Sequence, residues 1–453
     1  NAAVRWLQGG MLEGDQPTLP DPARCLLAIR EARTALAKNP DDWIAYRLLD
    51  AAYRFLAQAE TALLSGIPLD RRNQSRVSAL VPNIDVLNMR YKQRVTALNY
   101  AILTTPPPKT DETRRELQAL NMELFQLFLR AGCIDLARDR LQVVLDQIQP
   151  GGLPSPEAEA RYRQQLEQLN QRVKQVEDNL MDLQVERQAG PVEKAIAARN
   201  QGAPGLAIGE LEEANRGNMS PMIVKPQLVD LFCFTGQPDR AVELLSTGAS
   251  EDPNLGTEPG TSFLRQGQVY FLLGNYMTAA HLWQERAIPR LRFDRSMRAL
   301  LMAQVLARGE LTKATKINLE LPSLVSRQAY WEYELALCLL ESGSPDGAAD
   351  YFARALKLIP DLSVRPIIAY YLEKLGKPVP ELPKKADMPQ PRAGTTVDWL
   401  LRGPGPSPAT APLAAPKPAA TPAAPAEPAK PGNAPVSREK PKPAPSTGET
   451  KKK

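Results

Sequence analysis

Residues 331–360 carry apolar side chains every three or four positions, in two runs that a short polar stretch separates. Such spacing marks one face of a helix with 3.6 residues per turn. The first run comprises Trp331, Leu335 and Leu339, and the second comprises Ala348, Phe352, Ala355 and Leu356. Gly343 and Pro345 break the pattern between them, and Asp346 is the expected cap of the second helix. The pattern therefore predicts a helical hairpin that ends at Pro360.

The same hairpin pattern recurs along the second half of the chain. Turn glycines follow one another at steps of 34, 38, 35, 34 and 33 residues, at Gly202, Gly236, Gly274, Gly309, Gly343 and Gly376. An alanine stands five residues after each of the first five, at Ala207, Ala241, Ala279, Ala314 and Ala348. A small residue at this place lets two helices approach closely.

This period and these residues resemble the tetratricopeptide repeat (TPR), a helix–turn–helix unit of about 34 residues. The fullest match to the family pattern comprises Phe263, Gly267, Tyr270, Gly274, Ala279 and Trp283. The resemblance implies an all-α fold, a helix-turn-helix α-solenoid, with a regular array at 191–376. Residues 365–375 then form a single capping helix.

The first half of the chain follows the repeat less regularly. We expect irregular TPR-like hairpins over residues 1–150, with helices at 22–37, 43–64, 83–103, 111–130 and 136–148. A long helix follows at 155–188, where a heptad seam comprises Tyr162, Leu166, Leu169, Val173, Val176, Leu180 and Leu183. The seam either packs against neighbouring helices of the same chain or forms a coiled coil with a second copy. A monomer is the favoured state, and a coiled-coil dimer is the alternative.

From residue 377 onward the composition changes to Pro, Ala, Lys and Thr, which predicts a disordered tail over 377–453. The tail holds 13 Lys/Arg and 6 Asp/Glu, so its balance of +7 exceeds the net charge of +5 for the whole chain. The helical part is near −2, which argues against a nucleic-acid partner. Residues 394–403 interrupt the tail as a short motif, and its apolar side chains are Val397, Trp399, Leu400 and Leu401. The motif is expected either to dock on the last repeat near Tyr370 and Leu375, to capture another protein, or to be idle.

Residues with catalytic or metal-binding patterns are missing from the sequence. The single histidine, His281, lies within a predicted repeat helix, and the four cysteines are far apart. No phosphate-binding or dinucleotide-binding glycine motif occurs. We therefore expect a protein that is not an enzyme, with no cofactor and no metal, and no membrane span in these residues.

The resemblance also implies a binding surface, because the first helices of stacked repeats line a concave groove. The first-helix positions that face this groove are Leu264, Gln268, Phe271, Ala299, Ala303, Leu306, Tyr333 and Leu337. They lack the basic set by which chaperone-binding relatives clamp a carboxylate. These side chains either receive a peptide or helix of a partner, or form the core of a tightly wound array.

Two functions agree with these patterns. The first is a non-catalytic scaffold or adaptor that binds a protein or peptide. The second is the regulatory or assembly region of a larger enzyme or cell-envelope machine whose N-terminal part would precede Asn1. The cysteine usage favours a cytoplasmic location, and an upstream leader or anchor would place the protein in the cell envelope.

Overall fold

The computed structural model describes residues 3, 4, 7, 21–66, 88–147, 156–217, 221–246, 260–308 and 311–382. These residues belong to one compact unit, and all regular elements among them are helices. The predicted tail from 383 onward, with its motif at 394–403, lies outside the described residues.

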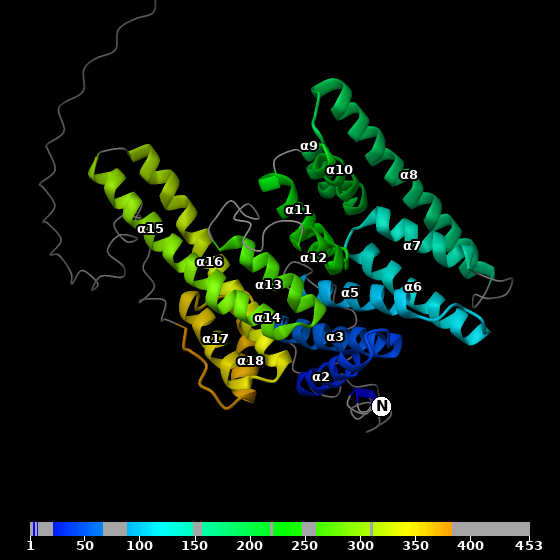
Figure 1. Ribbon diagram of the computed structural model, residues 1–453, viewed down its shortest axis with the longest axis horizontal. Coiled ribbons are helices and arrows are strands. Elements are labelled where there is room, and N and C mark those ends of the chain that lie inside the picture. Colours follow the sequence, from blue (N-terminus) through cyan, green and yellow to red (C-terminus); the bar gives the residue numbers. More distant parts are fainter. Residues whose placement is uncertain are drawn as a thin grey trace, which may run out of the picture. The chain divides into compact units, whose positions relative to one another are not determined.

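The first half of the chain forms a group of helices that we call the N-terminal layer (Figure 1). It comprises α2 (Pro22–Lys38), α3 (Trp43–Leu64), α5 (Asn88–Thr104), α6 (Asp111–Arg130) and α7 (Ile134–Asp146). Asp42 caps α3 as its position predicts, because its side chain accepts hydrogen bonds from the amides of Ile44 and Ala45. The predicted run of this helix to Leu64 is confirmed.

The long helix predicted from the heptad pattern is α8 (Pro156–Arg187). Leu169, Val173, Val176 and Leu180 of its seam are buried, and the remaining seam residues are partly buried. The seam packs mainly against α7 and also contacts α9 of the same chain. This chain therefore supplies its own partner for the seam.

The second half forms the array, from α9 to α18. Its helices are α9 (Pro191–Asn200), α10 (Pro204–Arg216), α11 (Pro221–Phe234), α12 (Pro238–Ser246), α13 (Thr261–Leu273), α14 (Tyr276–His281), the π-helical segment η2 (Leu282–Ala287), α15 (Ile288–Ala307), α16 (Leu311–Ser342), α17 (Pro345–Leu358) and α18 (Arg365–Lys374). A helix–turn–helix is formed by α9 with α10, by α11 with α12, by α13 with α14, and by α16 with α17. The array is a TPR-like α-solenoid.

The repeat glycines and alanines that the structure describes lie where the pattern predicts; Gly309 lies outside the described residues, and the side chain of Ala314 is not among those described. Gly202, Gly236, Gly274, Gly343 and Gly376 all have a positive φ, which glycine adopts without steric cost. The four alanines at 207, 241, 279 and 348 have no exposed surface. Close approach is most evident at Gly267, where an added Cβ would lie 2.1 Å from Nε1 of Trp283. That indole donates to the carbonyl of Leu264 at 3.0 Å.

Two regular features of the predicted array are wrong. The chain does not turn between the second helix of one repeat and the first helix of the next, because α14, η2 and α15 form one continuous helical run. Likewise α16 is one helix where the repeat pattern predicts two, the second helix of one repeat and the first helix of the next. It pairs with α15 as a long hairpin (Figure 1). Ser344, not Asp346, is the cap residue of α17, and it makes no side-chain capping bond.

The N-terminal layer packs along the turns of the array. Asn99 of α5 donates to the carbonyls of Thr235 and Gly236, after the end of α11. Two arginines of α2 donate to the last carbonyls of two further first helices. Arg33 binds the carbonyls of Leu272 and Leu273, and Arg30 binds those of Leu340 and Glu341. Carbonyls in the last turn of a helix lack the amide partners of the helix interior, so the arginines supply hydrogen bonds there and complement the negative end of the helix dipole.

A buried polar cluster fastens the two halves together. Arg90 of α5 donates to both carboxylate oxygens of Glu60 in α3, at 2.9 and 3.1 Å, and also to Glu341 of α16. Gln93, Tyr53 and Tyr276 donate to Glu341 as well, at 3.0–3.3 Å. The three charged side chains are almost fully buried, so each depends on these partners.

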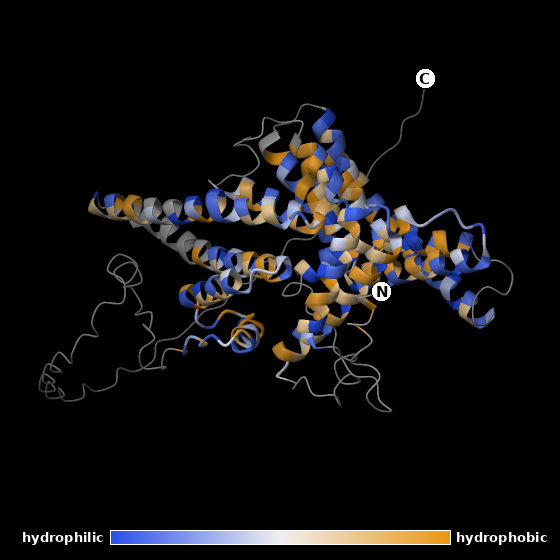
Figure 2. Ribbon diagram, turned by 60° about the horizontal axis from the view of Figure 1, so that its bottom comes forward, coloured by the Kyte–Doolittle hydropathy of each residue, from blue (hydrophilic) through white to orange (hydrophobic). Residues whose placement is uncertain are grey.

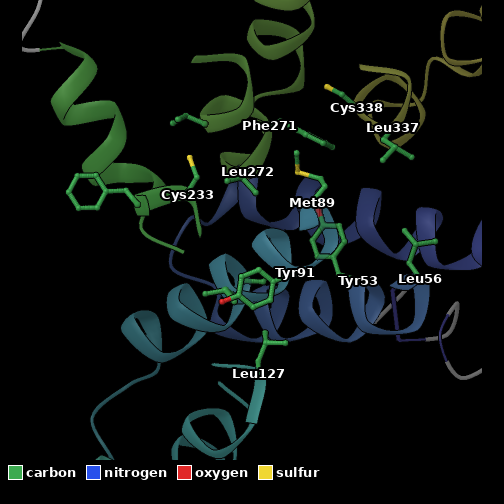
Figure 3. Packing of buried hydrophobic residues seen from close by; sticks show 14 of the residues in the cluster. Tyr53, Leu56, Met89, Tyr91, Leu127, Cys233, Phe271, Leu272, Leu337 and Cys338 are labelled. Atoms are coloured by element: carbon green, nitrogen blue, oxygen red, sulfur yellow. The ribbon is translucent and has the colours of Figure 1, made fainter. Parts of the chain in front are cut away.

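Apolar side chains surround this cluster. Tyr53, Leu56 and Met89 of the layer face Phe271, Leu272 and Leu337 of the array in Figure 3. Around this core, most helices carry polar and apolar residues on different sides (Figure 2). The last helix, α18, contacts both α17 and α3, so the end of the array is covered by the N-terminal layer.

Candidate functional site

The array encloses a cavity of about 940 Å³ on the side lined by its first helices. Four first helices contribute to the walls, namely α9, α11, α13 and α16, and α5 of the N-terminal layer contributes Lys92. The array therefore has a cavity of the size typical of ligand-binding sites, although the N-terminal layer packs against the turns of the array.

The apolar part of the wall contains two aromatic side chains. Trp331 of α16 is half-buried there, and its ring lies 6.1 Å from that of Trp283 behind it. The ring of Phe234 in α11 lies 4.9 Å from that of Tyr91 in α5, in a tilted arrangement, so it is held from the layer side. Leu264 and Leu231 complete this part of the wall. A half-exposed Trp held by packing is the type of anchor that protein interfaces favour.

Six charged side chains line the same cavity, and cations are in excess. They are Lys92, Arg199, Arg265, Arg327, Asp230 and Glu334. Arg265 makes two hydrogen bonds to the carboxylate of Asp230, at 2.9 and 3.1 Å, so this pair is mutually satisfied. The remaining charges leave the wall net positive.

At the contact of α5, α13 and α16, three polar side chains meet. Lys92 Nζ donates to Oε1 of Gln268 at 3.1 Å, and Gln268 also bonds to Glu334. Burial raises the pKa of Glu334 to about 7, against the opposing effects of Lys92 and the Gln268 hydrogen bond. Glu334 Oε2 is buried and has no hydrogen-bond partner, and the same holds for Thr261 Oγ1 on the same wall.

The structure brings only some of the predicted groove residues to the cavity. Leu264 and Gln268 line it. Phe271, Tyr333 and Leu337 are at most 5% exposed and pack in the core, where Phe271 and Leu337 face α3 and α5. Ala299 and Ala303 are half-buried on α15, and the side chain of Leu306 is not among those described. A partner-binding role for these eight residues stays a prediction.

The tail residues Val397, Trp399, Leu400 and Leu401 lie outside the described residues, so their docking stays a prediction too. Of the surface where they were expected to dock, Tyr370 already bonds to Asp21 through its hydroxyl, at 3.2 Å. Leu375 is half-buried against the core.

Sequence reasoning missed Lys92, Trp331 and Glu334 as wall residues. Trp331 was placed on the correct helix, but it was not named among the groove residues. Lys92 lies in a helix with three basic residues, Arg90, Lys92 and Arg94, and such charge in a sequence is typical of an exposed helix. In the structure α5 is buried on nearly every side: Arg90 and Arg94 pair with carboxylates of α3, α6 and α16, whereas Lys92 bonds to Gln268.

Groups that could carry out covalent chemistry are unfavourably placed in the described residues. The four cysteines are buried and free, and burial raises the pKa of the thiols of Cys25, Cys133 and Cys233 to about 12. Such thiols are poor nucleophiles. Across the described ranges, no three acidic, cysteine or histidine side chains group as a metal site.

No family model matches the chain, and no curated protein matches it. A solved structure that is similar is the TPR domain of P58(IPK), at 15% sequence identity and a TM-score of 0.25. The match covers 83% of this chain and 89% of that one. The TPR-like character of the fold rests on the hairpins, turn glycines and buried alanines described above.

In the part of the chain that the structure describes, no helix is both long and apolar enough to cross a membrane.

Proposed function

We propose that the protein is a non-catalytic scaffold that binds a segment of a partner protein in the cavity between α9, α11, α13 and α16. TPR-like folds are interaction folds, because stacked hairpins present a preformed surface at little entropic cost. The observation that carries the proposal is the cavity itself, about 940 Å³, with the half-buried Trp331 in its wall.

The dimensions of the site favour a peptide or a helix over a large folded surface. Three of the predicted groove residues, Phe271, Tyr333 and Leu337, are buried in the core, which leaves the stretch beside α5 as the described part of the predicted groove that lines the cavity. Leu264 and Gln268 belong to both the predicted groove and the observed cavity. An aromatic anchor with a mixed polar wall suits an extended or helical segment of a few residues.

A comparison of two single-residue variants tests this role. Trp331→Ala removes the aromatic wall, whereas Tyr330→Ala removes a neighbouring aromatic that is not in the cavity wall. Affinity purification of the intact protein from its native cells should recover a partner with the wild type and with Tyr330→Ala. The same partner should be lost with Trp331→Ala, while circular dichroism shows an unchanged helical content. Equal recovery by both variants would exclude the cavity as the binding site.

A further inference from the structure

The charged residues of α5 differ in how they are compensated. Arg90 lies between Glu60 and Glu341, and Arg94 bonds to Asp50 at 2.9 Å and to Glu123 at 3.0 Å. Both guanidinium groups thus have two carboxylates each. Lys92 lies between them in sequence and is 8% exposed, yet it pairs with no carboxylate of the described residues.

A buried ammonium group without a counter-ion is costly. Gln268 is the hydrogen-bond partner of Lys92, and its neutral amide oxygen satisfies one of the three N–H groups. Lys92 is also one of the residues that line the cavity, so an occupant of the cavity lies beside it. The site is therefore open to an acceptor that the chain itself does not provide.

The charge of Lys92 lowers the pKa of Glu334, so these two side chains interact, but Glu334 compensates the charge of the lysine poorly. Burial raises the pKa of Glu334 to about 7, so a substantial fraction of this carboxyl is protonated near neutral pH. In that form it is neutral, and its O–H can donate to an incoming oxygen. The other acidic side chain of the wall, Asp230, is held by the two bonds from Arg265.

Resting on the proposed function, we propose that the cavity accepts an acidic side chain, Asp or Glu, of the partner segment, whose carboxylate pairs with Lys92 Nζ. Charge complementarity supports an acidic occupant, because the wall carries four cations against two acidic residues. The carboxylate supplies the missing acceptor of Lys92, while the apolar residues beside it contact Trp331. A basic side chain paired with Glu334 is the opposite outcome.

Selection from a random peptide library displayed on phage tests this pairing on the intact protein. Peptides that bind the wild type are synthesised, and so are counterparts in which each Asp is replaced by Asn and each Glu by Gln. Binding is measured by calorimetry on the wild type, Lys92→Met, Lys92→Arg and Trp331→Ala. Lys92→Met keeps a long apolar stem in place, and its thermal midpoint shows whether the fold is intact.

We expect the selected peptides to carry an acidic residue, and the amide counterparts to bind about ten- to hundredfold more weakly, as for a hydrogen bond to a charged group. Lys92→Met should weaken the acidic peptide to the same extent, and Lys92→Arg should restore most of the affinity. If Lys92→Met fails to fold, the amide counterparts on the wild type and the Lys92→Arg variant still decide the question.

Other outcomes separate the two claims. Peptides that lose binding with Trp331→Ala but show no preference for acidic residues would overturn the pairing with Lys92 and leave the scaffold role in place. Enrichment of basic peptides would overturn the pairing as well. A selection in which no peptide depends on Trp331 would contradict both claims.

Discussion

Glycines at the repeat turns serve two purposes at once. Their positive φ lets the chain turn from the first helix into the second. Two of them also lie against the N-terminal layer, because a Cβ added at Gly236 would meet Val95 and Asn99 of α5, and one added at Gly274 would meet the guanidinium of Arg33. A side chain at these turns would therefore disturb the contact between the two halves as well as the turn.

The first prediction separates these two effects at Gly236. A Cβ there would lie 2.6 Å from Cγ1 of Val95 and 2.8 Å from its backbone carbon, whereas one at Gly376 would meet nothing within 4 Å. Gly376→Ala should cost only the left-handed conformation, about 1–2 kcal/mol. Gly236→Ala should cost a further 1–3 kcal/mol or so from overpacking. Urea unfolding measures both, and equal losses would show that α5 does not contact this turn.

Glu334 provides a second prediction through its raised pKa. The folded pKa of Glu334, about 7, exceeds the ordinary glutamate pKa of 4.5, so the folded state holds its proton more tightly than the unfolded chain does. Ionisation therefore costs stability: the loss begins as pH rises above about 4.5, grows up to about 7 and stays constant beyond.

Glu334→Gln removes this cost. Its thermal midpoint should exceed that of the wild type at about pH 8, and the difference should shrink at about pH 5. The exposed Glu213→Gln serves as the control, and it should change the midpoint equally at both pH values. A Glu334→Gln effect that is independent of pH would contradict the buried, partly protonated carboxyl.

At the residue level, the sequence predicted what depends on local periodicity. The turn glycines and the buried alanines follow from a 34-residue repeat, and both are confirmed. Lys92 and Arg33 could not be assigned in this way, because their partners lie 176 and about 240 positions away. In the sequence, a charged side chain at these positions predicts exposure to solvent. In the structure, long-range hydrogen bonds allow Lys92 to be buried and Arg33 to be half-buried.

At the level of elements, the limits of a helix were predicted well where a capping residue or a strict heptad seam marks the helix. Trp43–Leu64, Asp111–Arg130 and Pro156–Arg187 agree with their predicted limits to within a residue. The continuous helical run between two repeats was not predicted, because the repeat pattern implies a turn at each join. Pro289 lies at the start of α15 and has no N–H to donate, and the π-helical segment immediately before it carries the chain onward as one helix.

The third prediction concerns the seam of α8. Leu169 and Val176 are at most 4% exposed, against α7 and its neighbours, whereas Met181 and Val185 of the same helix are 64% and 79% exposed. Leu169→Asp with Val176→Asp should lower the thermal midpoint strongly, because two charges would be buried without partners. Met181→Asp with Val185→Asp is the matched control and should change little.

Sedimentation of the same proteins tests what the seam binds. We expect a monomeric wild type, since the seam is already covered within the chain. A dimer that the seam variant abolishes while the fold persists would contradict this expectation and favour the coiled coil.

The whole molecule is organised by the contact between its two halves. Arg30, Arg33 and Asn99 bind the ends of three first helices of the array, and Arg90 joins α3, α5 and α16 within the core. This contact explains why Phe271 and Leu337 are buried and why a partner is left with the cavity beside Lys92. A resemblance to one repeat could not predict it, because the repeat pattern describes only neighbouring hairpins.

Hydrogen exchange of the intact protein tests this contact most directly. Arg33→Met removes the bonds to the end of α13, whereas Arg54→Met removes an ion pair with Glu123 inside the N-terminal layer. If the halves unfold as one unit, Arg33→Met should speed exchange in α3 and α5 and, to the same extent, in α13 and α16. Arg54→Met should have little effect on the array. Acceleration confined to the end of α13, with α3 and α5 unchanged, would contradict the joint packing of the two halves.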